Sequence, residues 1–142
     1  MMPVRLFARA LLVALPLAAA SPAAADPARD QILAALLAEA QAADPGFAGF
    51  SAERGAAFYA ATQAGGKPDT PSCTTCHGAA PRDAGRTRAG KEIAPMAVSQ
   101  TPDRFTDAAK VEKWFGRNCN SVLGRDCSAA EKGDFITYLM GQ

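Results

Sequence analysis

The sequence has little of what several large protein classes require. It contains one histidine and one tryptophan among 142 residues, and its 15 basic side chains nearly balance 14 acidic ones. This balance gives no reason to expect a nucleic-acid partner. No apolar run reaches the roughly 20 residues that a membrane-spanning helix needs. A period-two alternation of apolar and polar residues is also missing, as is any repeat of roughly 20 to 50 residues. We therefore expect one all-α domain.

The first 25 residues differ from the rest of the chain. Arg5 and Arg9 precede a short apolar run over residues 10–20, and three alanines lead to Asp26. This pattern predicts a secretory signal peptide over 1–25 and a mature domain over 26–142. An uncleaved N-terminal anchor is the alternative. Without Arg5 and Arg9 the mature chain carries one net negative charge. Export to the periplasm would place the four cysteines in an oxidising compartment, where disulfides or cofactor bonds are expected.

Helical spacing and capping residues predict four main helices. The first covers about 28–42, with Asp26-Pro27 at its start, and the second begins at Ser51. Thr106 is expected to cap a third helix over 107–117, and a fourth covers 129–140. Residues 78–102 are rich in Gly, Pro and charge, and they read mostly as a loop. So long a loop in a small domain is unusual unless it wraps a cofactor.

Cys73-Thr74-Thr75-Cys76-His77 has the C-x-x-C-H spacing of c-type haem attachment. Two thiols at this spacing can reach both vinyl groups of one porphyrin edge, and the histidine that follows can bind the iron axially. The motif predicts one covalently attached haem c, with His77 as a ligand of the iron. Two alternatives are a redox dithiol and a zinc site completed by Cys119 and Cys127. The dithiol expects a βαβ context and the zinc site a shorter ligand spacing, and neither is present.

The second axial position decides between an electron carrier and a ligand-binding protein. Met96 follows Pro95 in the loop region and could supply a thioether. Asn118 ends the apolar face of Val111, Trp114 and Phe115, at the i, i+3, i+4 and i+7 positions of a helix. Asn120 points elsewhere if that helix continues, and Met140 reads as core. Spacing alone does not choose between Met96 and Asn118.

Several segments resemble SHP, the sphaeroides haem protein family. They are residues 65–78, 87–95, 101–107, 116–121 and 124–127, within a match that covers about residues 53 to 140. The asparagine-cysteine segment, Gly116-Arg117-Asn118-Cys119-Asn120-Ser121, is far more specific than C-x-x-C-H. The resemblance implies a single small class I-like cytochrome c domain of about four to five helices around one haem.

The resemblance also implies a function and a set of site residues. In this family the haem is high-spin, the asparagine that matches Asn118 binds the oxidised iron, and the cysteines that match Cys119 and Cys127 form a disulfide. On reduction Asn118 is expected to leave the iron, which then accepts oxygen, nitric oxide or a similar small ligand. A hard, neutral amide oxygen suits ferric iron better than ferrous iron, which gives a physical reason for this release.

The implied electron donors are a dihaem c-type cytochrome and a membrane b-type cytochrome. Asn118 would also be the catalytic residue if the protein reduced or converted its bound ligand. Binding and electron transfer are the better supported activities. The alternative function is a low-spin electron-transfer cytochrome c with His77 and Met96 as the two axial ligands.

The remaining assignments concern packing and charge. Trp114 and Phe115 are expected to pack on the haem. Cations in the loop could neutralise the haem propionates or dock an acidic partner, although a solvated loop is the simpler interpretation for most of them: Arg82, Arg86, Arg88 and Lys91. Gly55 and Phe58 resemble helix-crossing residues of small c-type cytochromes, with Tyr138 or Phe135 as the opposite contact.

Overall fold

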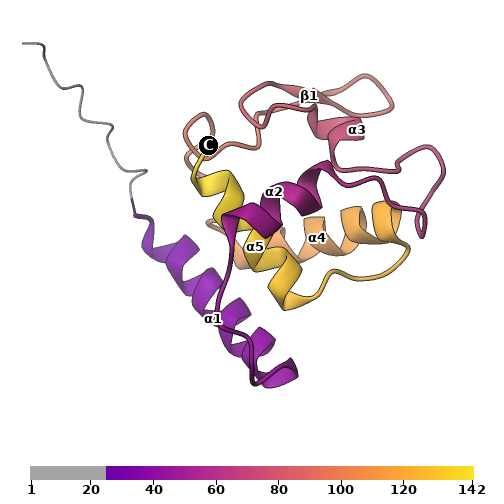
Figure 1. The fold of residues 1–142 in the computed structure, drawn as a ribbon. Helices are drawn as coiled ribbons and strands as arrows, with labels where there is room; N and C mark the ends of the chain where they lie inside the picture. Colours follow the sequence, from indigo (N-terminus) through magenta and orange to yellow (C-terminus); the bar gives the residue numbers. More distant parts are fainter. Residues whose placement is uncertain (1–24) are drawn as a thin grey trace, which may run out of the picture.

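A computed structural model describes residues 25–142, so the predicted signal peptide lies almost entirely outside the described residues. The described chain forms five helices and one small hairpin (Figure 1). The helices are α1 (Pro27–Ala43), α2 (Ala52–Ala60), α3 (Thr74–His77), α4 (Ala108–Leu123) and α5 (Ala129–Met140). The hairpin pairs β1 (Gly85–Arg86) with β2 (Glu92–Ile93) in antiparallel register, Gly85 opposite Ile93. The predicted all-α class is confirmed.

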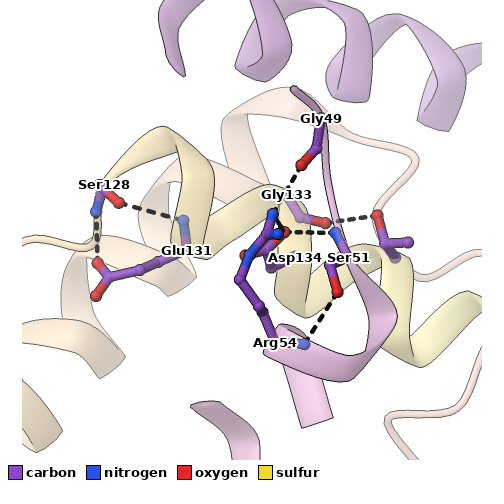
Figure 2. A network of polar contacts seen from close by, with 8 residues as sticks. Gly49, Ser51, Arg54, Ser128, Glu131, Gly133 and Asp134 are labelled. Atoms are coloured by element: carbon purple, nitrogen blue, oxygen red, sulfur yellow. Dashed lines mark hydrogen bonds and ion pairs between the residues drawn. The ribbon is translucent and has the colours of Figure 1, made fainter. Parts of the chain in front are cut away.

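Capping side chains set the starts of the helices. Asp26 accepts hydrogen bonds from the amides of Ala28 and Arg29, directly before Pro27 at the first helical position. Ser51 caps α2, as predicted. Ser128 and Glu131 form a reciprocal capping box at the start of α5 (Figure 2). These local bonds satisfy amides that have no partner inside the helix.

The third predicted helix is wrong at both ends. Asp107, rather than Thr106, caps α4 through the amide of Lys110. The helix also runs to Leu123 instead of ending near 117, and it stops where Gly124 adopts the left-handed conformation (φ 71°). Buried Cys119, Val122 and Leu123 extend its apolar face over this additional stretch. Asn118 consequently lies inside a helix and not at its end.

The helix crossing between α2 and α5 forms the centre of the fold (Figure 1). A Cβ atom at Gly55 would lie 2.0 Å from the Asp134 carbonyl oxygen and 2.8 Å from Cβ of Tyr138, so only glycine permits this approach. Tyr138 is therefore the predicted opposite contact, whereas Phe135 packs on the ring of Phe58, with centroids 6.3 Å apart.

An ion pair between exposed Arg54 and buried Asp134 reinforces the same crossing. The Arg54 guanidinium binds both carboxylate oxygens of Asp134, at 2.7 and 2.8 Å, and the Ser51 amide also donates to Asp134 (Figure 2). A guanidinium that donates to both oxygens of one carboxylate neutralises its charge and also fixes its orientation. Helix α1 also packs on α5, and its buried apolar residues are Ile32, Leu36 and Ala40.

Candidate haem site

A cavity of about 880 Å³ lies between α3, α4 and the connecting loops. This volume falls within the roughly 300–1,000 Å³ that cofactor sites commonly occupy. Its walls include all but one of the site residues predicted from the sequence: Cys73, Cys76, His77, Met96, Trp114, Phe115, Asn118 and Cys119. Cys127, the exception, is bonded to Cys119. Residues separated by more than 40 positions in the sequence thus meet around one cavity.

The attachment segment occupies one part of the cavity wall. Cys73 directly precedes α3, and Cys76 and His77 lie within its single turn, so all three side chains start from a very short stretch of backbone. The two thiols are free and partly buried. Burial, with a smaller contribution from Arg104, lowers the pKa of His77 to about 4. A neutral imidazole is the form that binds a metal ion.

The imidazole of His77 also has a buried nitrogen without a hydrogen-bond partner. Among the described residues, its Nδ1 is the only buried side-chain nitrogen or oxygen without a hydrogen-bond partner. Buried polar groups normally find a partner, so such an atom needs an explanation. Two free thiols and an uncommitted imidazole at a cavity of this size fit a covalently attached haem.

The other candidate ligands belong to a different part of the wall. Asn118 is exposed on α4, and its amide makes no hydrogen bond to any described residue. The amide of Asn120 instead donates to the Gly116 carbonyl at 2.8 Å and to Asp126 Oδ1 at 2.7 Å. Both asparagines line the cavity, but the Asn120 side chain is held through its NH2 group, whereas the Asn118 amide is held by no described residue.

Two features hold the C-terminal half of α4 beside Asn118. Cys119 and Cys127 form a disulfide, with Cα atoms 5.6 Å apart, as the resemblance implied. This bond also excludes a zinc site built from all four cysteines. On the other side, the Lys67 amide and the Thr70 hydroxyl both donate to the Ser121 carbonyl, at 2.8 and 3.1 Å. No local pattern in the sequence predicts the Thr70 contact.

Met96 lies in the cavity wall and is only 6% exposed. Backbone bonds hold its neighbours, because the Ala97 amide donates to the Pro81 carbonyl and the Val98 amide to the Leu139 carbonyl. On the other side of Met96, the Pro95 carbonyl accepts from Thr101 Oγ1 and Arg104 Nε, both at 2.9 Å. The segment that carries Met96 is thus fastened at both ends. Met140, which the sequence assigns to the core, is partly buried against the hydrophobic core.

The cations at the cavity differ from those singled out in the sequence. Of Arg82, Arg86, Arg88 and Lys91, only Arg88 lines the cavity, and it pairs with Asp69 at 2.6 Å. The others are exposed, and Arg86 donates to the Gly90 carbonyl. Further cations at the wall come from other segments: Lys67, Arg104, Lys110 and Arg117. Their proximity depends on tertiary contacts that no local pattern reveals.

Comparison with known proteins identifies the family. The chain is 68% identical over 91 residues to the cytochrome c-type protein SHP of Cereibacter sphaeroides, covering 64% of this chain and 70% of that protein. The chain belongs to the SHP family of c-type cytochromes. Residues 45–139 also match a domain of unknown function, DUF1924. Like its relatives in this family, the chain carries one covalently attached haem c.

Solved structures agree with the family assignment. The structure of oxidised SHP, described as an oxygen-binding cytochrome c, superposes with a TM-score of 0.74 at 59% identity, covering 80% of this chain and 96% of the other. Oxidised cytochrome c'' of Methylophilus methylotrophus gives a TM-score of 0.66 at 34% identity, covering 79% of this chain and 92% of the other. The predicted small cytochrome fold is therefore confirmed. Within residues 25–142, no helix is long and apolar enough to span a bilayer.

Proposed function

We propose that this protein is a periplasmic, high-spin cytochrome that transfers electrons and binds a small ligand such as oxygen or nitric oxide when reduced. Cys73 and Cys76 would hold the haem, His77 would be one axial ligand and Asn118 the other ligand in the oxidised protein. Haem iron supplies one-electron redox chemistry and an axial site for a diatomic molecule. The free amide of Asn118 at the cavity wall is the observation that carries the proposal.

Asn118 would act as a ligand that depends on the redox state. Its neutral amide oxygen is a hard donor, so its affinity for the iron falls when the ferric ion is reduced to the softer ferrous ion. Asn118 would then vacate the axial position only in the reduced protein. In the oxidised protein the same side chain would exclude stray ligands.

The disulfide supports this role mechanically. Cys119 follows Asn118 directly, and its bond to Cys127 ties this turn of α4 to the segment before α5. The Thr70 and Lys67 bonds to Ser121 hold the next turn. We propose that these attachments limit how far Asn118 moves when it leaves, so that it can return after oxidation.

Apolar and charged residues of the wall would complete the pocket. Phe115 is buried and packs edge-on against Phe135, with centroids 5.4 Å apart, so it would present a fixed apolar surface to the haem. Trp114 lies at the cavity, with Lys113 and Arg117 each within 6 Å of its ring, at 5.6 and 5.7 Å. Nearby cations such as Arg104 would offset the haem propionates.

Three further parts of the proposal rest on the family or on the sequence pattern. Oxygen as a ligand follows from the oxygen-binding SHP relative. The signal peptide over 1–25 would export the chain. A dihaem c-type cytochrome and a membrane b-type cytochrome would supply electrons. Turnover of the bound ligand is not part of the proposal.

The second candidate is a low-spin carrier with His77 and Met96 as ligands, and the buried position of Met96 in the cavity wall favours it. Absorption spectra of matched variants distinguish the two. Asn118→Ala should change the ferric spectrum, whereas Asn120→Ala and Met96→Leu should leave it unchanged. The reduced wild-type protein should be high-spin and shift with carbon monoxide. A low-spin ferrous spectrum that ignores carbon monoxide would refute the proposal.

A further inference from the structure

Tyr59 joins the helix crossing to the attachment segment. It lies on α2, is only 1% exposed, and its ring packs on Phe135 and Tyr138, each with centroids 5.8 Å away. Its hydroxyl lies 2.8 Å from the Gly78 carbonyl oxygen and 3.2 Å from the His77 carbonyl oxygen. One phenolic proton is thus shared between two carbonyls at the end of α3.

These carbonyls need a partner from outside their own helix. Helix α3 is four residues long, and the last carbonyls of any helix have no N–H donor within that helix. Packing alone would be satisfied by phenylalanine at position 59, because the ring already fills the space beside Phe135 and Tyr138. The hydroxyl therefore adds a specific bond to the backbone of His77. Burial raises the pKa of Tyr59, so the phenol keeps its proton.

The other side of the same backbone is also enclosed. A Cβ atom at Gly85 would lie 2.2 Å from the Cys76 carbonyl oxygen and 2.9 Å from Cα of His77. Strand β1 thus packs directly on the attachment turn. The Tyr59 hydroxyl binds the carbonyls at the end of the same turn. Displacement of the His77 backbone would have to break the phenol bond or move β1.

We infer that Tyr59 is a positioning residue that fixes the backbone of His77 and thereby the orientation of its imidazole toward the iron. This inference rests on the proposed function, because it requires His77 to be the axial ligand. Groups that hold a metal ligand from behind commonly tune the metal's affinity and reactivity. Tyr59 does so here from a helix whose main role is in the core.

The test compares Tyr59→Phe with Tyr138→Phe in the full haem-bound protein. Both variants remove one hydroxyl from the same aromatic cluster, but the Tyr138 hydroxyl makes no hydrogen bond to any described residue. Resonance Raman spectra of the reduced protein report the iron–histidine stretch. We expect this frequency to differ from the wild-type value in Tyr59→Phe and to equal it in Tyr138→Phe. Carbon monoxide dissociation should change on the order of tenfold in Tyr59→Phe alone.

The outcomes separate this inference from the proposed function. Absence of an iron–histidine band from the reduced wild-type protein would overturn the proposed function, because that band requires a high-spin ferrous iron with His77 as its one strong axial ligand. A wild-type band that Tyr59→Phe leaves in place would overturn only the role of Tyr59. If Tyr59→Phe does not mature, 3-fluorotyrosine at position 59 keeps the ring and the donor while changing donor strength. An unshifted band in that protein would also count against the inference.

Discussion

The two parts of the cavity wall that carry the proposed iron ligands are held in different ways. His77 belongs to a single helical turn enclosed by Tyr59 and β1, and its imidazole is largely buried. Asn118 lies exposed on a 16-residue helix, and no residue of 25–142 bonds to its amide. Its neighbours Cys119 and Ser121 are fastened, but the side chain itself is not. One proposed ligand is thus held in place, while the side chain of the other proposed ligand is unconstrained.

Loss of the fixed ligand should have the largest effect. We expect His77→Ala to cause near-complete loss of correctly matured haem protein, because no other described histidine can replace the imidazole. Asn118→Ala is the matched variant from the other part of the wall, and it should retain full haem content. Haem absorbance per mole of protein measures both. Equal haem loss in the two variants would remove the distinction between a fixed and a releasable ligand.

Removal of the disulfide should have the next largest effect. The bond closes a nine-residue loop, so the paired change Cys119→Ser with Cys127→Ser should lower the free energy of unfolding by about 2.5 kcal/mol. Chemical denaturation of the haem-bound protein measures this change. We also expect slower return of the ferric spectrum after oxidation, because Asn118 would be less confined. Unchanged return kinetics would limit the disulfide to a stabilising role.

Removal of the Thr70 contact should have a smaller effect on the same region of α4. Thr70→Val removes the hydroxyl that donates to the Ser121 carbonyl and should cost about 1 kcal/mol of unfolding free energy. Its spectroscopic effect should appear in the oxidised protein, where Asn118 is the proposed ligand. The iron–histidine frequency of the reduced protein should not change. A shift of that frequency would show that the two parts of the wall are mechanically coupled.

The smallest expected effect depends on pH and lies away from the site. A hydrogen bond from Arg125 lowers the pKa of Glu131, so this carboxylate stabilises the folded state above its ordinary pKa. The contribution should disappear as the pH falls through the lowered value. Because Arg125 is largely exposed, Glu131→Gln should cost at most about 1 kcal/mol at neutral pH. Below the lowered pKa the variant and the wild type should converge in thermal stability, with haem spectra unaffected throughout.

Local signals predicted the features that depend on neighbouring residues. Asp26-Pro27 marked the start of α1 and Ser51 that of α2, because capping acts over three or four positions. The C-x-x-C-H motif likewise predicted haem attachment, because its residues lie within five consecutive positions. The continuation of α4 to Leu123 was missed, since Asn118, Asn120 and Ser121 individually disfavour a helix interior. Packing of Cys119, Val122 and Leu123 overrides that preference.

Long-range contacts could not be predicted from the sequence. The Tyr59 hydroxyl meets carbonyls 18 and 19 positions away. Arg29, which is 1% exposed, donates to the Pro102 and Arg104 carbonyls more than 70 positions away. Neither residue has a sequence neighbour that predicts such a bond. The asparagine-cysteine segment was found only through its resemblance to a family, because helical spacing left Asn118 and Met96 equivalent.

Ligand-binding kinetics in both oxidation states test the central claim, a side chain that closes the site only when the iron is oxidised. The measurement compares cyanide association with the oxidised protein and carbon monoxide association with the reduced protein, for wild type and Asn118→Ala. We predict that the substitution accelerates cyanide binding at least about tenfold, because a competing ligand is removed. Carbon monoxide binding should stay within about twofold. Equal acceleration in both states, or none in the oxidised state, would contradict the account.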